Sequence, residues 1–288
     1  MDYTKRQQMT LSKNCYEYAE VVNAFKGFLQ ETESAKLSML LRHKDTLHIK
    51  KIEMEVLTRW KKAYKNRVLA RFYKLNDYLK ESGTDYTFCT FTTRQDMTLE
   101  EQYEFIKAKF RKLRDVMRKE IGKFDYVWVT EAHKTGYSHI HMLAFCIIPE
   151  KMQEHYKELW QNKYEAGDKK GMDFSTSADK GQIRSVKNYI MKYISKTLDS
   201  LTENAEMLHN AVAWHMSRRS NLNSKGFRFY GMSKNLTSVC SLRGAEAGQY
   251  YCIKSVYTDS NGNSRILREL GDMELLRAGY EALNNEFA

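Results

Sequence analysis

Apolar residues recur along this chain with two different periods, and these periods predict its elements. Between residues 99 and 121 they return every three or four positions, which is typical of an amphipathic helix. Thr98 followed by Glu101 predicts a capping box at the start of that helix. Runs of β-branched and aromatic residues predict strands at 86–93, 124–131, 138–148 and 172–175.

The order of these elements predicts the fold class. A further helix is expected from residue 150 to about residue 166, so the series reads strand, helix, strand, strand, helix, strand. This is the order of a split-βαβ, ferredoxin-like sheet. We therefore expect an α+β protein with an antiparallel sheet that carries helices on one face. Beyond it, the sequence predicts a helix at 186–198, a strand at 227–231 and a hairpin over 250–270.

The first 83 residues are predicted to be mainly helical. One stripe of apolar positions recurs there at three- and four-residue steps, namely Val56, Leu57, Trp60, Tyr64, Val68, Phe72, Leu75 and Leu79. The polar run 81–85 then interrupts the helix. We accordingly predict three regions: a helical, basic N-terminal region over 1–83, the split-βαβ domain over 84–236, and a C-terminal extension with a hairpin and a helix over 237–288.

The composition is that of a folded protein without a membrane segment. Of 288 residues, 42% are hydrophobic, which suffices for one large domain or two modest ones. No apolar run reaches the roughly 18 residues of a membrane span, and no signal peptide is recognised. The five cysteines are scattered and never spaced as CxxC, which argues against a disulfide framework or a zinc ribbon. We expect a reduced, cytoplasmic setting.

Positive charge is concentrated in one part of the chain. The 47 Lys and Arg against 36 Asp and Glu give a net charge of +11, which favours a polyanionic partner such as nucleic acid. Residues 1–41 are neutral, residues 42–80 carry a net +8, and residues 81–288 carry only +3. We therefore predict that the segment 42–80 binds phosphates with little sequence preference, through Arg59, Lys61, Lys62, Lys65, Arg67 and Arg71.

Two histidines stand one residue apart on a predicted strand. Side chains two positions apart on a strand point to the same face, so His139 and His141 project together, as metal ligands must. Glu131 lies across a tight turn on the preceding strand and can reach the same face. Two imidazoles and one carboxylate would make an open site for a divalent cation. A structural reading is equally open, in which the histidines lie on a half-buried strand and bond to their neighbours.

A second motif repeats a tyrosine and a lysine along the helix predicted at 186–198. Tyr189 is followed by Lys192, and Tyr193 by Lys196, a double YxxK of which about 0.03 copies are expected by chance. Residues four apart share one helical face, so both phenols would be presented to one site. A neighbouring lysine can hold a phosphate or stabilise the phenolate that a tyrosine nucleophile requires. The helix is also explained as simply amphipathic, with half-buried tyrosines and lysines that extend to solvent.

Together these motifs resemble those of the HUH endonucleases, and within them the rolling-circle replication initiators of phages and plasmids. Residues 88–92 (FCTFT) resemble the first motif, residues 139–141 (HIH) match the second, and residues 189–196 match the third. The doubled tyrosine is similar to the two-tyrosine branch, exemplified by bacteriophage replication gene A proteins. Residues 228–233 resemble a stretch that these proteins often carry after the tyrosine helix. The resemblance covers roughly residues 84–236, which are thus expected to form the endonuclease domain.

The resemblance implies a mechanism. One tyrosine attacks a phosphate of single-stranded DNA at a replication origin, which leaves a 5′-phosphotyrosine and a 3′-hydroxyl that primes a host polymerase. A divalent cation, Mg²⁺ or Mn²⁺, supplies the charge that polarises the phosphate. The implied catalytic residues are Tyr189, Tyr193, Lys192 and Lys196, the implied metal ligands are His139, His141 and Glu131, and the implied DNA contacts of the first motif are Thr90 and Thr92.

The resemblance also implies partners and leaves alternatives. A host helicase and polymerase are expected in the cytoplasm of a prokaryotic cell, without a nucleotide cofactor, because each transesterification conserves the bond energy. No GxxxxGK[ST] motif is present, so the helicase domain of eukaryotic-virus initiators is not expected. A tyrosine transposase could use the same HUH site on the ends of a mobile element. A non-catalytic, basic DNA-binding regulator, in which the histidines and tyrosines are structural, would be a protein of a different class.

Overall fold

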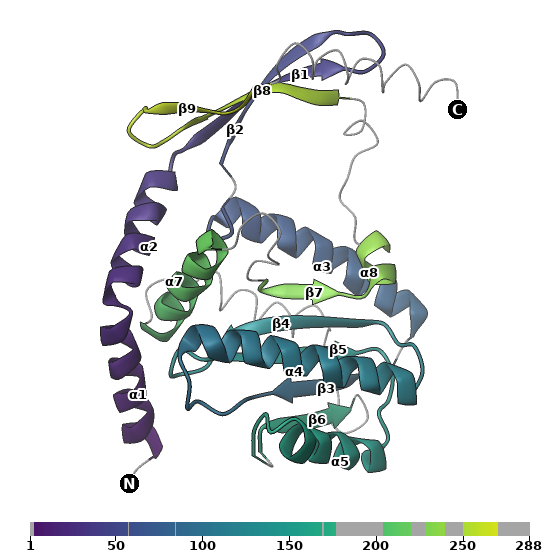
Figure 1. Ribbon diagram of the computed structural model, residues 1–288. Coiled ribbons are helices and arrows are strands. Elements are labelled where there is room, and N and C mark those ends of the chain that lie inside the picture. The colour runs from purple at the N-terminus through teal and green to yellow at the C-terminus, as the bar shows by residue number, and fades with distance from the viewer. Residues whose placement is uncertain are drawn as a thin grey trace. The chain divides into compact units, whose positions relative to one another are not determined.

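The protein is α+β with antiparallel sheets, as the sequence predicts, and the chain divides into two compact units. A computed structural model describes residues 3–56, 58–83, 85–168, 170–176, 204–219, 228–239 and 250–269 (Figure 1). The first unit comprises residues 1–25 and 65–241, and the second comprises residues 26–64 and 242–288. No helix in the described ranges is long and apolar enough to cross a bilayer.

A five-stranded antiparallel sheet forms the centre of the first unit. Its strands pair in the order β6-β3-β5-β4-β7. They are β3 (Thr87–Phe91), β4 (Tyr126–Ala132), β5 (Ser138–Ala144), β6 (Met172–Thr176) and β7 (Tyr230–Met232). The first four strands alternate with α4 (Leu99–Glu120) and α5 (Glu150–Glu158) in the βαββαβ order, which confirms the split-βαβ prediction. The expected strand near residue 230 is β7, which extends the sheet beyond β4.

Helices α4 and α5 cover one face of this sheet (Figure 1). The predicted capping box is present at the start of α4, where the Thr98 hydroxyl accepts from the Glu101 backbone N–H and the Glu101 carboxylate accepts from that of Thr98. Every second strand residue meets the apolar stripe of the helices. The buried cluster includes Cys89, Phe91, Ile140 and Met142 from the strands, Ile106, Phe110, Leu113 and Met117 from α4, and Tyr156 and Trp160 from α5 and the π-helical turn after it (Leu159–Lys163).

The other helices of the first unit pack around the edges of the sheet. The helix α1 (Tyr3–Glu17), the start of α2 (Ala19–Thr32) and α7 (Asn204–Arg219) meet at the turn between β4 and β5, in a cluster with Leu11, Val22, Leu99, Tyr137, Leu208 and Val212. The helix α3 (Lys62–Ser82) buries the second half of the predicted apolar stripe, and its Phe72 ring lies 5.6 Å from that of Tyr230 in β7. A short helix, α8 (Lys234–Val239), follows β7.

The second unit contains a four-stranded sheet that the sequence predicts only in part. Its strands, in the order β2-β1-β8-β9, are β1 (Lys36–His43), β2 (Ile49–Glu55), β8 (Tyr250–Thr258) and β9 (Ser264–Glu269). The pair β8–β9 is the predicted C-terminal hairpin. The pair β1–β2 lies inside the mainly helical N-terminal region and is not expected from the sequence, because β1 pairs with β8, whose residues come more than 200 positions later.

The apolar stripe predicted as one helix is consequently divided. Val56 follows β2, and Trp60 lies in the turn before α3, where its ring meets that of Phe28 edge-on at 5.9 Å. The helical character of the N-terminal region is confirmed by α1, α2 and α3, while the division into regions 1–83, 84–236 and 237–288 stays a prediction. The helices predicted at 186–198 and in the C-terminal extension lie outside the described residues.

The packing of α4 on the sheet can be tested at Leu113, which is fully buried between them. Leu113→Ala should lower the free energy of unfolding by about 3 kcal/mol, because the lost methyl groups leave a cavity in a close-packed layer. The neighbouring exposed Lys112→Ala should change it by less than about 0.5 kcal/mol. Urea unfolding of both variants checks this, and an equal loss in the two would contradict the assignment of the α4 stripe to the core.

Candidate metal centre

The pairing of β4 with β5 places the three predicted metal ligands on one face of the sheet. Glu131 lies directly opposite His139 across the connecting turn, and His141 follows two residues later on β5. Directly opposed residues of antiparallel strands share a face, and so do residues two apart on one strand. Ile140 points the other way, into the cluster under α4. The cluster of Glu131, His139 and His141 therefore lies on the face opposite α4 and α5.

The ligand atoms of this cluster converge. Glu131 Oε2 lies 2.8 Å from His141 Nε2 and 3.8 Å from His139 Nε2. The two imidazole centroids are 4.9 Å apart, and all three ligand atoms lie within 4.8 Å of one another. Glu131 is only 6% exposed and His141 only 7%. A carboxylate buried this deeply requires a positive or hydrogen-bonding partner, and two imidazoles with one carboxylate are a donor set that fits a divalent cation.

Two neighbours fix the orientation of His141. The Thr90 Oγ1 atom lies 3.2 Å from Nδ1 of His141. The Phe88 ring stacks on the imidazole with the centroids 5.5 Å apart and the planes at 16°. In the tautomer that leaves Nε2 bare for a cation, Nδ1–H donates to the Thr90 hydroxyl oxygen. A hydrogen bond of this kind orients most metal-binding histidines in proteins.

The segment that holds this cluster is similar to a known family. Residues 86–198 match the family model of the replication-associated protein ORF2. The matched segment spans β3 to β6, the whole Glu-His-His cluster and the double YxxK motif. No curated protein and no solved structure matched the chain. The resemblance to replication initiators is thus confirmed at the level of this family, and it supports a role in DNA replication.

Gln102 of α4 holds the start of β5 in this replication-associated domain. Its side chain is buried, and its amide nitrogen donates to the Ser138 carbonyl and to Thr93 Oγ1, both at 2.7 Å. Its Oε1 accepts from the Ser138 N–H at 3.0 Å. One side chain therefore fixes both backbone groups of the residue before His139. Sequence reasoning missed Gln102, because one polar residue near a helix start carries no local sign of a partner on a strand.

His209 of α7 lies behind the same end of β5. Its Nδ1 is 3.5 Å from the Ser138 hydroxyl oxygen. Burial lowers the pKa of His209 to about 4, although a hydrogen bond with the backbone of Gly136 and the charge of Glu131 act in the opposite direction. The ring is therefore neutral at pH 7. Sequence reasoning had no reason to connect His209 with the strand histidines, since nearly 70 residues separate them.

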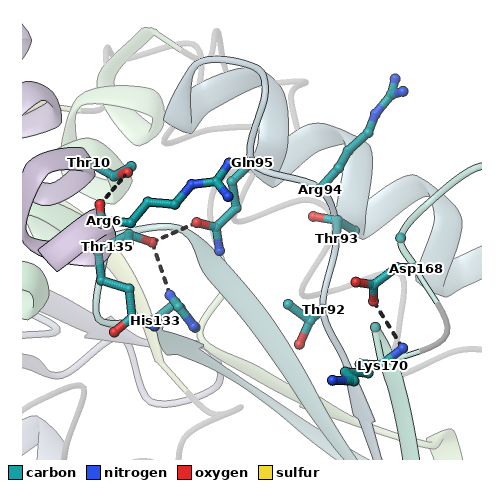
Figure 2. A pocket seen from close by; sticks show the side chains of 13 residues that line it. Arg6, Thr10, Thr92, Thr93, Arg94, Gln95, His133, Thr135, Asp168 and Lys170 are labelled. Atoms are coloured by element: carbon teal, nitrogen blue, oxygen red, sulfur yellow. Dashed lines mark hydrogen bonds between the residues drawn. The ribbon is translucent and has the colours of Figure 1, made fainter. Parts of the chain in front are cut away.

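The remaining predicted site residues lie apart from the cluster. Thr92, directly after β3, lies beside a pocket that Figure 2 shows. The predicted DNA-binding bases lie on α3 or just before it: Arg59, Lys61, Lys62, Lys65, Arg67 and Arg71. Lys62 and Arg67 are exposed, whereas Arg71 is half-buried and its Nη1 donates to the Tyr230 hydroxyl at 3.1 Å. The residues Tyr189, Lys192, Tyr193 and Lys196 lie outside the described residues.

The metal reading of the cluster makes a direct prediction for cation binding. Replacing a ligand in Glu131→Ala or His141→Ala should raise the Kd for Mn²⁺ by more than about tenfold, because two donors hold the ion less well than three. Calorimetric titration of the purified protein measures this. Mg²⁺ should bind more weakly than Mn²⁺, since imidazole nitrogen suits the softer ion better.

His155→Ala supplies the matched control, because His155 lies on α5, away from the cluster and half-exposed. It should leave the Kd for Mn²⁺ unchanged. If Glu131→Ala and His141→Ala bind Mn²⁺ as tightly as the unmodified protein, the histidines are structural and the metal reading is wrong.

Proposed function

We propose that this protein is a rolling-circle replication initiator that nicks and rejoins single-stranded DNA through a covalent 5′-phosphotyrosine. The observation that carries the proposal is the convergence of Glu131, His139 and His141 on the sheet face opposite α4 and α5. The match to replication-associated proteins spans this cluster and both tyrosines of the double YxxK motif, which supports placing them in one active site.

The described residues of the site have separate tasks. His139, His141 and Glu131 would hold Mn²⁺ or Mg²⁺, and such a cation supplies positive charge that polarises the scissile phosphate. Thr90 and Phe88 hold the His141 ring in one orientation, so that the site is formed before DNA binds. Burial of Glu131 and His141 keeps water from competing for their charges.

The covalent step exchanges one phosphodiester for another. The phenol oxygen of Tyr189 or Tyr193 bonds to the scissile phosphorus, and the bond from phosphorus to the 3′ oxygen breaks. The phenol loses its proton, and the departing 3′ oxygen gains one. Lys192 and Lys196 stabilise the phenolate and the charge that develops on the phosphate. Because the phosphate ester is conserved, the reaction consumes no nucleotide cofactor.

Two tyrosines allow a full replication cycle. The free 3′-hydroxyl primes a host polymerase while a host helicase opens the duplex. When the origin has been regenerated, the second tyrosine attacks it and takes over the covalent link. The released 3′-hydroxyl can then attack the first phosphotyrosine, which closes the displaced strand into a circle.

A covalent adduct is the expected signature of this reaction. The protein is incubated with Mn²⁺ and a pool of single strands from a candidate origin, labelled at either the 5′ or the 3′ end. A 3′ label should move with the protein on a denaturing gel, while a 5′ label should appear on a shorter free fragment, because the tyrosine joins the 5′ phosphate. Tyr189→Phe/Tyr193→Phe should form no adduct, and each single variant should retain nicking but lose strand transfer.

Tyr78→Phe on α3 is the matched control, since this tyrosine is exposed and lies outside both motifs. It should form adducts at the normal rate. An adduct that persists in the double variant would sink the tyrosine assignment. If no strand is cleaved by the unmodified protein, the reading as a non-catalytic DNA-binding regulator is favoured instead.

The structure sharpens how the basic segment 42–80 has to be tested. Deleting it would remove β2 from the second sheet and Val68, Phe72 and Leu75 from the core, so loss of DNA binding would say nothing about charge. Charge reversal at exposed positions avoids this. We expect Lys62→Glu/Arg67→Glu/Lys74→Glu to weaken single-strand binding and to lower the slope of log K against log salt by about 2, because three phosphate contacts are lost.

A triple reversal on the opposite side of the sheet is the control for this effect. Lys112, Lys119 and Lys151 are exposed on α4 and α5, which cover the face away from the metal centre. Lys112→Glu/Lys119→Glu/Lys151→Glu changes the net charge equally and should leave most of the slope intact. Equal effects of the two triple variants, measured by fluorescence anisotropy, would show that only net charge matters and not the basic segment.

A further inference from the structure

A polar pocket of about 580 Å³ lies beside the candidate metal centre, within the first unit. Four parts of the chain line it: the start of α1, the segment that follows β3, the turn between β4 and β5, and the loop before β6. Figure 2 shows Arg6 of α1 and Lys170 of the loop on opposite sides of this pocket. Pockets of this volume hold ligands the size of a nucleotide.

The wall formed by the loop is fixed by hydrogen bonds to the segment after β3. The Thr92 carbonyl accepts from Trp160 Nε1 at 3.0 Å, and the Thr92 N–H donates to the Gly171 carbonyl at 2.6 Å. A Cβ at Gly167 or at Gly171 would lie only 2.9 Å from the Thr92 carbonyl oxygen. Only glycine permits so close an approach, so the two glycines hold the loop residues between them at the rim of the pocket.

The other wall is fixed in a similar way. His133 Nδ1 lies 3.0 Å from the Thr135 hydroxyl, which donates to Gln95 Oε1 at 2.9 Å (Figure 2). The Asn14 side chain donates to the Thr135 carbonyl at 3.1 Å, and this bond joins α1 to the turn. The buried cluster of Leu11, Leu99, Tyr137 and Leu208 adds apolar contacts at the same place. Arg6 is therefore positioned by the fold, although it lies near the start of the chain.

The lining of the pocket favours an anion. It contains the bases Arg6, Arg94 and Lys170 and a single acid, Asp168. The Asp168 carboxylate already accepts from the Lys170 backbone N–H at 2.9 Å. Threonine hydroxyls and the Gln95 amide supply neutral groups for hydrogen bonds. Cationic side chains with hydroxyl and amide groups are the usual partners of phosphate and sugar oxygens in nucleic acids.

The pocket adjoins the metal centre through one residue. The His133 ring lines the pocket, and its centroid lies 5.5 Å from that of the ligand His139. From this adjacency and the charge of the lining, we infer that the pocket binds a sugar-phosphate unit of the single strand, next to the phosphate that lies at the metal centre. The inference rests on the proposed function. It makes the N-terminal helix α1 part of the DNA site.

Binding without chemistry tests this inference. Arg6→Gln/Lys170→Gln should raise the Kd for a fluorescent oligothymidylate about tenfold at low salt and lower the salt slope by about 1.4, since two phosphate contacts are lost. Anisotropy is measured in EDTA, so the result does not depend on nicking. The Kd for Mn²⁺ should stay unchanged, because neither side chain belongs to the metal centre. Glutamine keeps the polarity of both positions without the charge, and thermal unfolding checks that the variant is folded.

Lys13→Gln is the matched control, because Lys13 is also on α1 but points to solvent, with 76% of its side chain exposed. It should bind the oligonucleotide normally. Normal binding by Arg6→Gln/Lys170→Gln would overturn the inference while adduct formation keeps the proposed function. Weakened binding in a protein that never forms an adduct would support the pocket and overturn the nuclease.

A competition experiment identifies the source of the phosphate. Thymidine 5′-monophosphate and inorganic phosphate are added separately to the bound oligonucleotide. A strand site should require millimolar amounts of either competitor, because neighbouring contacts along the strand are missing. If the mononucleotide alone binds as tightly as the oligonucleotide and loses this affinity in Arg6→Gln/Lys170→Gln, the pocket is a nucleotide site and the inference of a strand site is wrong.

Discussion

The register between β4 and β5 is the constraint on which the candidate site depends. The turn from His133 to Tyr137 closes the hairpin so that Glu131 faces His139, and this pairing puts the carboxylate beside both imidazoles. A shift of one residue would turn either the carboxylate or the histidines toward α4. Gln102 secures the register from outside the hairpin, because it bonds to both backbone groups of Ser138.

The two faces of this sheet divide stability from chemistry. On one face, α4 and α5 bury an apolar layer in which residues such as Phe91, Leu113 and Met142 exclude water. On the other face, the same strands carry Thr90 and His141, which bond to each other. Because neighbouring residues of a strand point to opposite faces, the apolar layer fixes the positions of the polar residues between its members. A rigid layer under a site is what keeps catalytic groups in place.

The structure also connects parts of the chain that are distant in sequence. The helix α1 contributes Arg6 to the pocket beside the metal centre, and α7 brings His209 behind β5. In the second unit, β1 pairs with β8 to join two hairpins into one sheet. The family match reaches only from residue 86 to residue 198, so these contributions come from segments that flank the matched domain.

Local patterns in the sequence were enough to predict the elements of the first sheet and the chemistry of its site. Runs of strand-forming residues predicted the strands, the capping box marked the start of α4, and the spacing of His139 and His141 put them on a common face. Contacts between distant segments became visible only in the folded chain. The β1–β2 hairpin, the role of Gln102 and the pocket with Arg6 and Lys170 all depend on such contacts. They escape sequence reasoning because periodicity reports which face of an element is buried, whereas the identity of its partner depends on packing across the whole chain.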